Sequence, residues 1–123
     1  MSKNPAFQDL SREELLAMQD LVAATYVKET VVRYIVALIT ATRENEYLLR
    51  GASPRATLAV TSMAKAIARL RGRDFVVPKD VQEVFLRTVA HRLLLTPRAE
   101  TAGITAEKVL EQILSGVPAP NAV

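Results

Sequence analysis

The chain has 123 residues and a formal net charge of +3; half of its residues are apolar and only 5% are aromatic. It contains no cysteine, which excludes a disulfide framework and a thiolate metal site. It has no apolar run of about twenty residues, the length that spans a membrane. Its first residues also lack the apolar core of a signal peptide, so we expect a cytoplasmic protein. The mild charge and few aromatic side chains do not favour nucleic-acid binding.

Hydrophobic periodicity predicts five helices, at about residues 12–24, 28–42, 54–71, 78–94 and 106–115, followed by a proline-containing tail at 117–123. Ser11, Ser53 and Thr105 are placed to cap helix N-termini, and Gly72 to end the third helix. Residues 98–104 are expected to form a loop in which Ile104 lies against residues 75–77 in a minimal extended pairing. The sequence therefore predicts an all-α fold, a small bundle of about five helices in one domain over residues 1–123.

The apolar spacing also predicts which helix faces are buried. The second helix is expected to be the most buried, with one stripe at Val31, Ile35 and Leu38 and another at Val32, Val36 and Ile39. The third helix is expected to face the core with Ala56, Val60, Met63, Ile67 and Leu70. Its opposite side carries Arg55, Ser62, Lys65 and Arg69, and it contains no acidic residue.

The start of the third helix is the strongest candidate for a binding site. In the stretch Gly51-Ala52-Ser53-Pro54-Arg55-Ala56, Gly51 allows a sharp turn, Ser53 suits the N-cap and Pro54 suits the first helical position. The other four predicted helices carry acids in their first turns, whereas this one places Arg55 there. Because helix N-termini attract anions, the pattern predicts an anion supplied from elsewhere, with phosphate the first candidate. A merely solvated arginine is the alternative.

Other polar residues are weaker candidates. His91 is the only histidine and has no second histidine or cysteine to join it, so we predict no metal ligand, no catalytic residue and a packed, hydrogen-bonded role. Arg71 and Arg73 are expected to complement the negative end of the third helix rather than to contact nucleotide or a neighbouring subunit. Arg92 could pair with a surface acid or a ligand. Local ion pairing and capping explain Arg43-Glu44.

Four blocks of sequence occur in a fixed order: Tyr34-Ile35-Val36 with Ala41-Thr42-Arg43-Glu44, then Gly51-Ala52-Ser53-Pro54-Arg55-Ala56, then Arg71-Gly72-Arg73-Asp74-Phe75-Val76-Val77-Pro78-Lys79-Asp80-Val81, then His91-Arg92-Leu93. Together they resemble the C-terminal lid domain of MoxR-type AAA+ ATPases, from about Asn4 to Pro118. The resemblance implies that Ser53-Pro54-Arg55 is the sensor 2 motif. Arg55 would then reach the terminal phosphates of ATP, which is held with Mg²⁺ by a preceding core domain.

The resemblance also implies a ring-shaped oligomer, usually a hexamer, with a chaperone-like role in assembling or activating other proteins. Its partners would be the preceding core domain, neighbouring subunits and proteins with a von Willebrand factor A domain. The chain has no phosphate-binding loop and no Walker B acids, so alone it is not expected to hydrolyse ATP, although its parent would. Two alternatives stay open: the lid of a magnesium-chelatase-like or helicase-like AAA+ machine, and a stand-alone helical adaptor or weak nucleic-acid-binding module.

Overall fold

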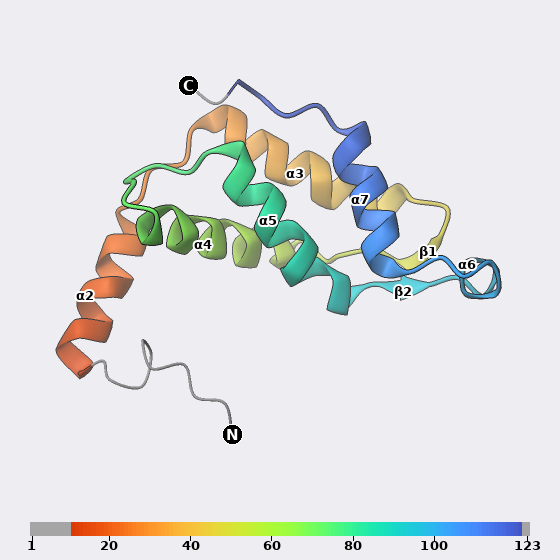
Figure 1. Ribbon diagram of the computed structural model, residues 1–123, viewed down its shortest axis with the longest axis horizontal. Coiled ribbons are helices and arrows are strands. Elements are labelled where there is room, and N and C mark those ends of the chain that lie inside the picture. The colour runs from red at the N-terminus through yellow and green to blue at the C-terminus, as the bar shows by residue number, and fades with distance from the viewer. Residues whose placement is uncertain (1–10, 122–123) are drawn as a thin grey trace.

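The structure, a computed structural model, describes residues 11–121, apart from the side chain of Arg92. Its helices are α2 (Arg12–Ala23), α3 (Glu29–Glu44), α4 (Arg55–Leu70), α5 (Pro78–Val89), α6 (Pro97–Thr101) and α7 (Ala106–Gly116), with a 3₁₀ turn η1 (Ala90–Arg92). Two short strands, β1 (Leu48–Arg50) and β2 (Leu94–Leu95), pair antiparallel. The predicted all-α helical bundle is confirmed (Figure 1). Between residues 11 and 121, no helix is long and apolar enough to cross a membrane.

The core lies between α3, α4, α5 and α7, with α5 packed along α4 (Figure 1). The face of α4 that enters this core is its small-residue face, namely Ala56, Val60, Ala64 and Ala68, all fully buried. The predicted core residues Met63 and Leu70 are instead 46% and 74% exposed. Alanine side chains let two helices approach closely. The face of α4 with small side chains, rather than the face with long apolar side chains, therefore packs against α5.

Helix α3 buries one face only. The first predicted stripe, Val31, Ile35 and Leu38, is buried as expected. The second stripe was wrong in part, because Val32 and Val36 are 39% and 47% exposed and only Ile39 is buried. Tyr34 is buried in their place, since it lies on the face of α3 that meets the rest of the bundle.

The chain after α5 differs from the prediction. Helix α5 ends at Val89 rather than near residue 94, and β2 then pairs with β1, with Leu95 opposite Leu48. The expected partners of the extended pairing were wrong: Phe75 forms a parallel bridge with Tyr26, and the Ile104 N–H donates to Ala99 instead.

Residues 98–104 are also not a simple loop, because α6 (Pro97–Thr101) covers the first four of them. The Thr96 hydroxyl accepts from the Ala99 N–H at 3.1 Å, and Gly103, at φ +75°, ends the helix. The predicted caps elsewhere are confirmed: Ser11 accepts from the Glu14 N–H and Thr105 from the Lys108 N–H, each at 3.1 Å.

Gly72 ends α4 as predicted, with φ +76°. Its N–H donates to the Arg69 carbonyl at 3.0 Å, and the Arg73 N–H donates to the Ala68 carbonyl at 2.9 Å. These two bonds form a Schellman motif, which satisfies the last carbonyls of the helix. The chain therefore leaves α4 on a fixed path that carries Arg71 and Arg73 toward α5.

Candidate functional site

The start of α4 is fastened to the end of α3. The Ala52 N–H donates to Thr42 Oγ1 at 3.0 Å, and that hydroxyl donates to the Ile39 carbonyl at 2.6 Å. Gly51 lies so close to α3 that a Cβ atom there would be 2.5 Å from the Thr42 carbonyl oxygen and 2.6 Å from Arg43 Cα. Glycine is needed here because two backbones approach closely. Two of the sequence blocks, one from each helix, therefore meet at a fixed corner.

Helix α4 begins at Arg55, directly after Pro54, which already has helical angles of φ −56° and ψ −27°. The predicted Ser53 cap was wrong, because its hydroxyl makes no hydrogen bond to any residue in the described range 11–121. The reason is that the Ala56 N–H, which the hydroxyl would have capped, donates instead to the Ser53 carbonyl at 2.9 Å. The Ser53 hydroxyl is therefore available to another acceptor or donor.

Arg55 is exposed, and within the described part of the chain its side chain has neither an ion pair nor a hydrogen bond. The first turn of α4 contains no acid, whereas the first turns of α2, α3, α5, α6 and α7 each contain at least one. A cation at the positive end of a helix gains nothing from that helix. The first turn of α4 thus carries a guanidinium and no carboxylate, whereas the first turns of the other described α-helices carry carboxylates.

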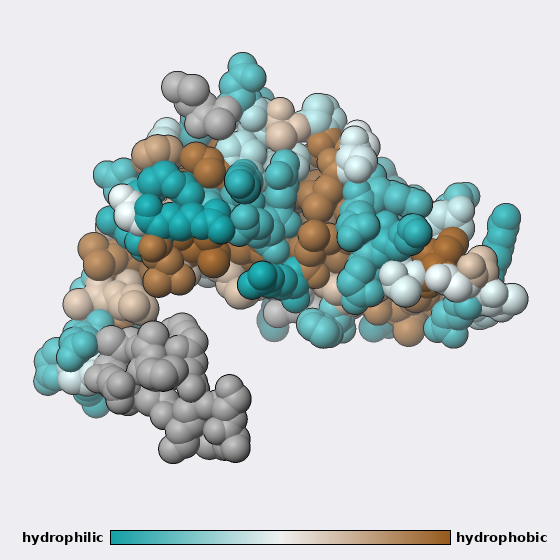
Figure 2. Space-filling model, in the orientation of Figure 1, coloured by the Kyte–Doolittle hydropathy of each residue, from teal (hydrophilic) through white to brown (hydrophobic). Residues whose placement is uncertain are grey.

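The face of α4 that starts at Arg55 is exposed and carries both apolar and polar side chains. Leu58, one turn along, is 72% exposed, and Ser62 and Lys65 follow at helical spacing. Figure 2 shows apolar surface over α4 next to a band of hydrophilic side chains. With Met63 and Leu70, which are 46% and 74% exposed, α4 carries three exposed large apolar side chains, as a surface covered by another protein part does.

The arginines at the other end of α4 have partners inside the chain. Arg73 donates to both carboxylate oxygens of Asp80 at 2.7 Å, and Arg71 donates to Asp80 at 3.3 Å and to Glu83 at 2.6 Å. The Asp80 side chain is fully buried and also accepts from the Val77 N–H at 2.9 Å. The prediction that Arg71 and Arg73 serve the dipole of α4 therefore misses their main partner, which lies on α5.

This cluster shifts two pKa values. Burial raises the pKa of Asp80, but the hydrogen bonds from Arg73 and from the Val77 N–H, with the charges of Arg73 and Arg71, bring it below the ordinary value. The hydrogen bond to Asp80 raises the pKa of Arg73, against the opposing effect of burial. The Arg73 guanidinium also lies 5.8 Å from the centre of the Phe75 ring. Arg71, Arg73 and Asp80 form a structural ion cluster.

The remaining candidate residues do not form a site together with Arg55 at the start of α4. His91 is exposed on η1 and has no hydrogen bond in the described region, so its predicted packed role was wrong; α5 ends before it. Arg43 and Glu44 are exposed and form no ion pair with any described residue. The Arg92 side chain lies outside the described structure. Arg50, which the sequence analysis missed, is an exposed arginine at the end of β1, three residues before Ser53.

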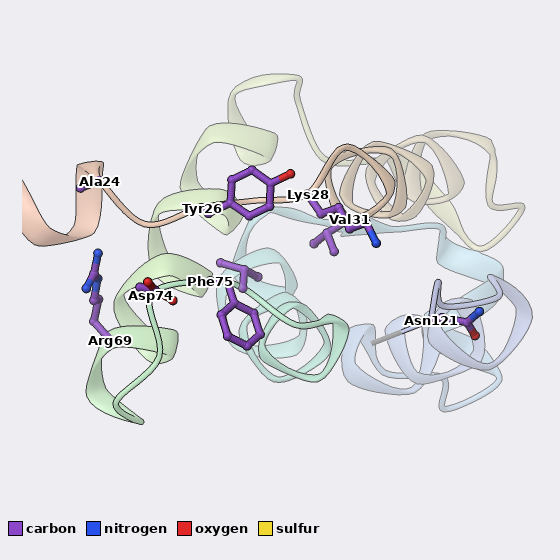
Figure 3. Close-up of a pocket in the computed structure, with 9 residues that line it drawn as sticks. Ala24, Tyr26, Lys28, Val31, Arg69, Asp74, Phe75 and Asn121 are labelled. Carbon is purple, nitrogen blue, oxygen red and sulfur yellow. The ribbon is translucent and has the colours of Figure 1, made fainter. Parts of the chain in front are cut away.

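A separate groove of about 720 Å³ lies beside the far end of α4 (Figure 3). It is lined by the segment that joins α2 to α3, including Ala24 and Tyr26, and by Arg69 and Phe75. Tyr26 and Phe75 are 62% and 41% exposed. Arg55 is not part of this groove. Among residues 11–121, no group of three or more histidine, aspartate or glutamate side chains could hold a metal ion.

A family model described as the AAA lid domain matches residues 40–113, more than half of the chain. The chain belongs to the AAA lid domain family. This match spans the fixed corner, Arg55 and the ion cluster at Asp80. The resemblance to the MoxR-type lid, drawn from the four sequence blocks, is thereby supported by an independent comparison.

Comparison with individual proteins also supports the assignment of this AAA lid to the MoxR type. It is 40% identical over 125 residues to Chaperone MoxR1 of Mycobacterium tuberculosis, covering 94% of this chain and 33% of that protein. It is 33% identical over 111 residues to the uncharacterized protein YeaC of Bacillus subtilis, covering 90% and 35%. A crystal structure of a putative ATPase from Cytophaga hutchinsonii superposes with a TM-score of 0.86 at 32% identity, covering 91% of this chain and 37% of that one. The AAA lid is thus of the MoxR type and spans about a third of the length of these relatives.

Proposed function

We propose that this AAA lid closes over ATP that is held with Mg²⁺ by a preceding AAA+ core domain, and that Arg55 contacts the terminal phosphate as the sensor 2 arginine. Pro54 sets the start of the helix, and Ser53 offers a hydroxyl that no described residue uses. The guanidinium of Arg55 would donate charge-assisted hydrogen bonds to phosphate oxygens. The parent protein would be an ATP hydrolase, and the lid alone would not be.

One observation carries this proposal: Arg55 has no partner among residues 11–121 and lies at an acid-free helix start whose backbone is fixed by Thr42 and Gly51. A fixed backbone matters because a sensor must hold its donors in place before the phosphate arrives. The exposed Leu58 beside it supports a surface that the core domain covers. A merely solvated arginine would not need a corner this closely packed.

The wider role follows from the relatives. One of them carries the printed name Chaperone MoxR1, which supports a chaperone-like role in the assembly or activation of other proteins. We further propose that the parent forms a ring, usually a hexamer, and acts with a partner that has a von Willebrand factor A domain. The nucleic-acid alternative loses support because the Arg69 Nε–H, on the basic side of α4, already donates to Leu21 and Thr25.

The test is the Arg55→Ala variant of the full-length parent. Losing charge-assisted hydrogen bonds worth about 1.5–3 kcal/mol should weaken ATP binding or slow turnover by about 10–100-fold. Arg98→Ala is the matched control, because Arg98 is also exposed and free of described partners, and the charge change is the same. Circular dichroism would check that both variants fold. Equal nucleotide affinity and turnover in the two variants would refute the role of Arg55.

A further inference from the structure

Helix α2 is attached to the bundle with little packing. None of its residues is buried, and Leu15, Leu16 and Leu21 are 43%, 49% and 52% exposed. Figure 1 shows α2 extending away from the other helices. A groove of about 450 Å³, lined in part by Met18 on α2 and Lys65 on α4, lies between the two helices. Apolar burial therefore contributes little to holding α2 in its observed direction.

The backbone of the segment after α2 is hydrogen-bonded to the bundle from Tyr26 onward. The Tyr26 N–H donates to the Asp74 carbonyl at 2.8 Å, and the Val76 N–H donates to the Tyr26 carbonyl at 2.9 Å. Helix α2 ends at Ala23, so the joint between the helix and the fixed segment is Ala24-Thr25. The 720 Å³ groove opens beside Ala24, which leaves room next to this joint (Figure 3).

Arg69 of α4 bridges that joint. Its Nε–H is shared between the Leu21 carbonyl at 3.1 Å, in the last turn of α2, and Thr25 Oγ1 at 2.8 Å, within the joint itself. The Thr25 hydroxyl in turn donates to the Leu21 carbonyl at 2.8 Å, and Thr25 is buried. Figure 3 shows Arg69 pointing from the end of α4 toward the segment near Ala24.

The electrostatics of α2 favour this contact. A helix C-terminus carries partial negative charge and is stabilised by a nearby cation. The last turn of α2 contains no basic residue of its own. Arg69 supplies that cation from a different helix, through a charge-assisted hydrogen bond to a carbonyl of the last turn.

We propose that Arg69 is a positioning residue that locks the direction of α2 relative to α4, so that the two helices move as one body. Arg69 and Arg55 are fourteen residues apart on the same helix, which corresponds to about 21 Å along its axis. A displacement of the Arg55 end would then be passed to α2 through Arg69. Only this last step rests on the proposed function; the lock itself does not require Arg55 to bind phosphate.

The lock can be tested on this 123-residue chain by spin labelling, since the sequence has no native cysteine. Labels at Gln19→Cys on α2 and Arg87→Cys on α5 report the direction of α2 through their distance distribution. We expect a narrow distribution for the otherwise unchanged chain and a broad one for Arg69→Met, which keeps an unbranched apolar stem but removes the donor. Arg69→Lys, which keeps the charge, should restore part of the narrowing.

Arg71→Met is the matched control, because Arg71 lies at the same helix end but bonds to Asp80 and Glu83 instead of α2. It should leave the label distances unchanged. Amide exchange in the last turn of α2 should be roughly tenfold faster in Arg69→Met, as expected for the loss of one charge-assisted hydrogen bond, while exchange in α5 stays the same. Thr25→Val, which removes one acceptor, gives a second and milder variant if Arg69→Met does not fold.

Two outcomes would overturn the proposal. One is a distance distribution for Arg69→Met as narrow as that of the unchanged chain. The other is equal broadening in Arg69→Met and Arg71→Met, which would mean general loosening of the bundle. The Arg55→Ala variant distinguishes the role of Arg69 from the proposed function. In the isolated chain it should leave the label distance distribution narrow, because Arg69 still holds α2. In the parent, Arg69→Met should keep ATP affinity but lose any ATP-dependent change in the position of α2.

Discussion

The two ends of α4 carry arginines that look alike in the sequence and differ in the structure. At the C-terminal end, Arg69 contacts the end of α2, and Arg71 and Arg73 contact Asp80 on α5. At the N-terminal end, Arg55 has no partner among residues 11–121. The difference leaves Arg55 as the arginine of α4 without a described partner, and it comes from the surroundings of each end rather than from the residue type.

The polarity of a helix explains the difference. A helix C-terminus lies among acceptors, because its own last carbonyls and the carboxylates that start the next helix are nearby. A helix N-terminus presents only donors, so a cation there finds no acceptor in its own helix. Asp80, in the first turn of α5, is a suitable partner for that helix start and for Arg73 at the same time. The start of α4 contains no equivalent carboxylate.

The largest loss of stability should come from disrupting the ion cluster at the C-terminal end of α4. Asp80→Asn removes a fully buried carboxylate that accepts from Arg73, Arg71 and the Val77 N–H. Removing one partner of a buried ion pair costs about 3–5 kcal/mol of unfolding free energy. Urea unfolding at neutral pH measures this loss. Glu83→Gln is the control, because Glu83 is part-exposed and its one partner within residues 11–121 is Arg71, and it should change stability by about 1 kcal/mol or less.

The same cluster predicts a dependence on pH. The pKa of Asp80 in the folded chain lies below its ordinary value of about 3.9. The carboxylate therefore stabilises the fold above about pH 4, and this contribution is lost as the pH falls through the lowered pKa. The stability difference between the unchanged chain and Asp80→Asn should shrink between pH 7 and pH 3. An equal difference at both values would show that the charge of Asp80 is not what stabilises the cluster.

Much of the fold could be predicted from the sequence, because the helices have strong apolar periodicity and clear end signals. Ser11, Thr105 and Gly72 act as predicted. Helix α6 was missed although Thr96-Pro97 and Gly103 are the signals of a helix start and end; a helix of five residues is too short to show periodicity. Contacts between distant segments, such as β1 with β2, could not be predicted, since two or three residues carry no pairing register.

Only those features of the candidate site that depend on neighbouring residues in the sequence could be predicted. The acid-free start at Arg55 is visible in the sequence, because it depends on residues next to one another. The partner of Arg73 depends on how the chain turns after Gly72 and where α5 begins, which the apolar pattern does not specify. The role of Arg69 depends on α2, more than forty residues away in the chain. Long-range hydrogen bonds of this kind are set by packing and were therefore missed.

Another prediction concerns how firmly the backbone is held at the N-terminal end of α4, where Arg55 has no described partner. In Gly51→Ala the new Cβ would lie 2.5 Å from the Thr42 carbonyl oxygen, so the backbone must shift, at a cost of about 1–3 kcal/mol. Gly72→Ala should cost about 1–2 kcal/mol, because its φ of +76° is unfavourable for alanine although space is available. Gly116→Ala, in open space at the end of α7, should be close to neutral. Thermal unfolding of the three variants would contradict this ranking if Gly51→Ala were the mildest.

A further prediction tests the hydrogen bond between the Ala52 N–H and Thr42, which fixes the start of α4 to the end of α3. Thr42→Val has nearly the same shape but leaves the buried Ala52 N–H without its acceptor, which should cost about 1–3 kcal/mol. Thr42→Ser keeps the hydroxyl and serves as the control. If valine and serine were equally stable, the hydrogen bond to Ala52 would not be what holds the start of α4. In the parent, Thr42→Val should also weaken ATP binding, because the donors at Arg55 would no longer be held in place.

The smallest effect on stability should come from Arg55→Ala in this chain. The side chain is exposed and has no partner in the described structure, so its removal should change the unfolding free energy by less than about 0.5 kcal/mol. Arg73→Ala, which leaves the buried Asp80 without its main partner, should be strongly destabilising by comparison. Urea unfolding of the two variants compares the ends of α4 directly. A large loss of stability in Arg55→Ala would mean that this arginine serves the fold of the chain, and the case for an external anion at the helix start would then fail.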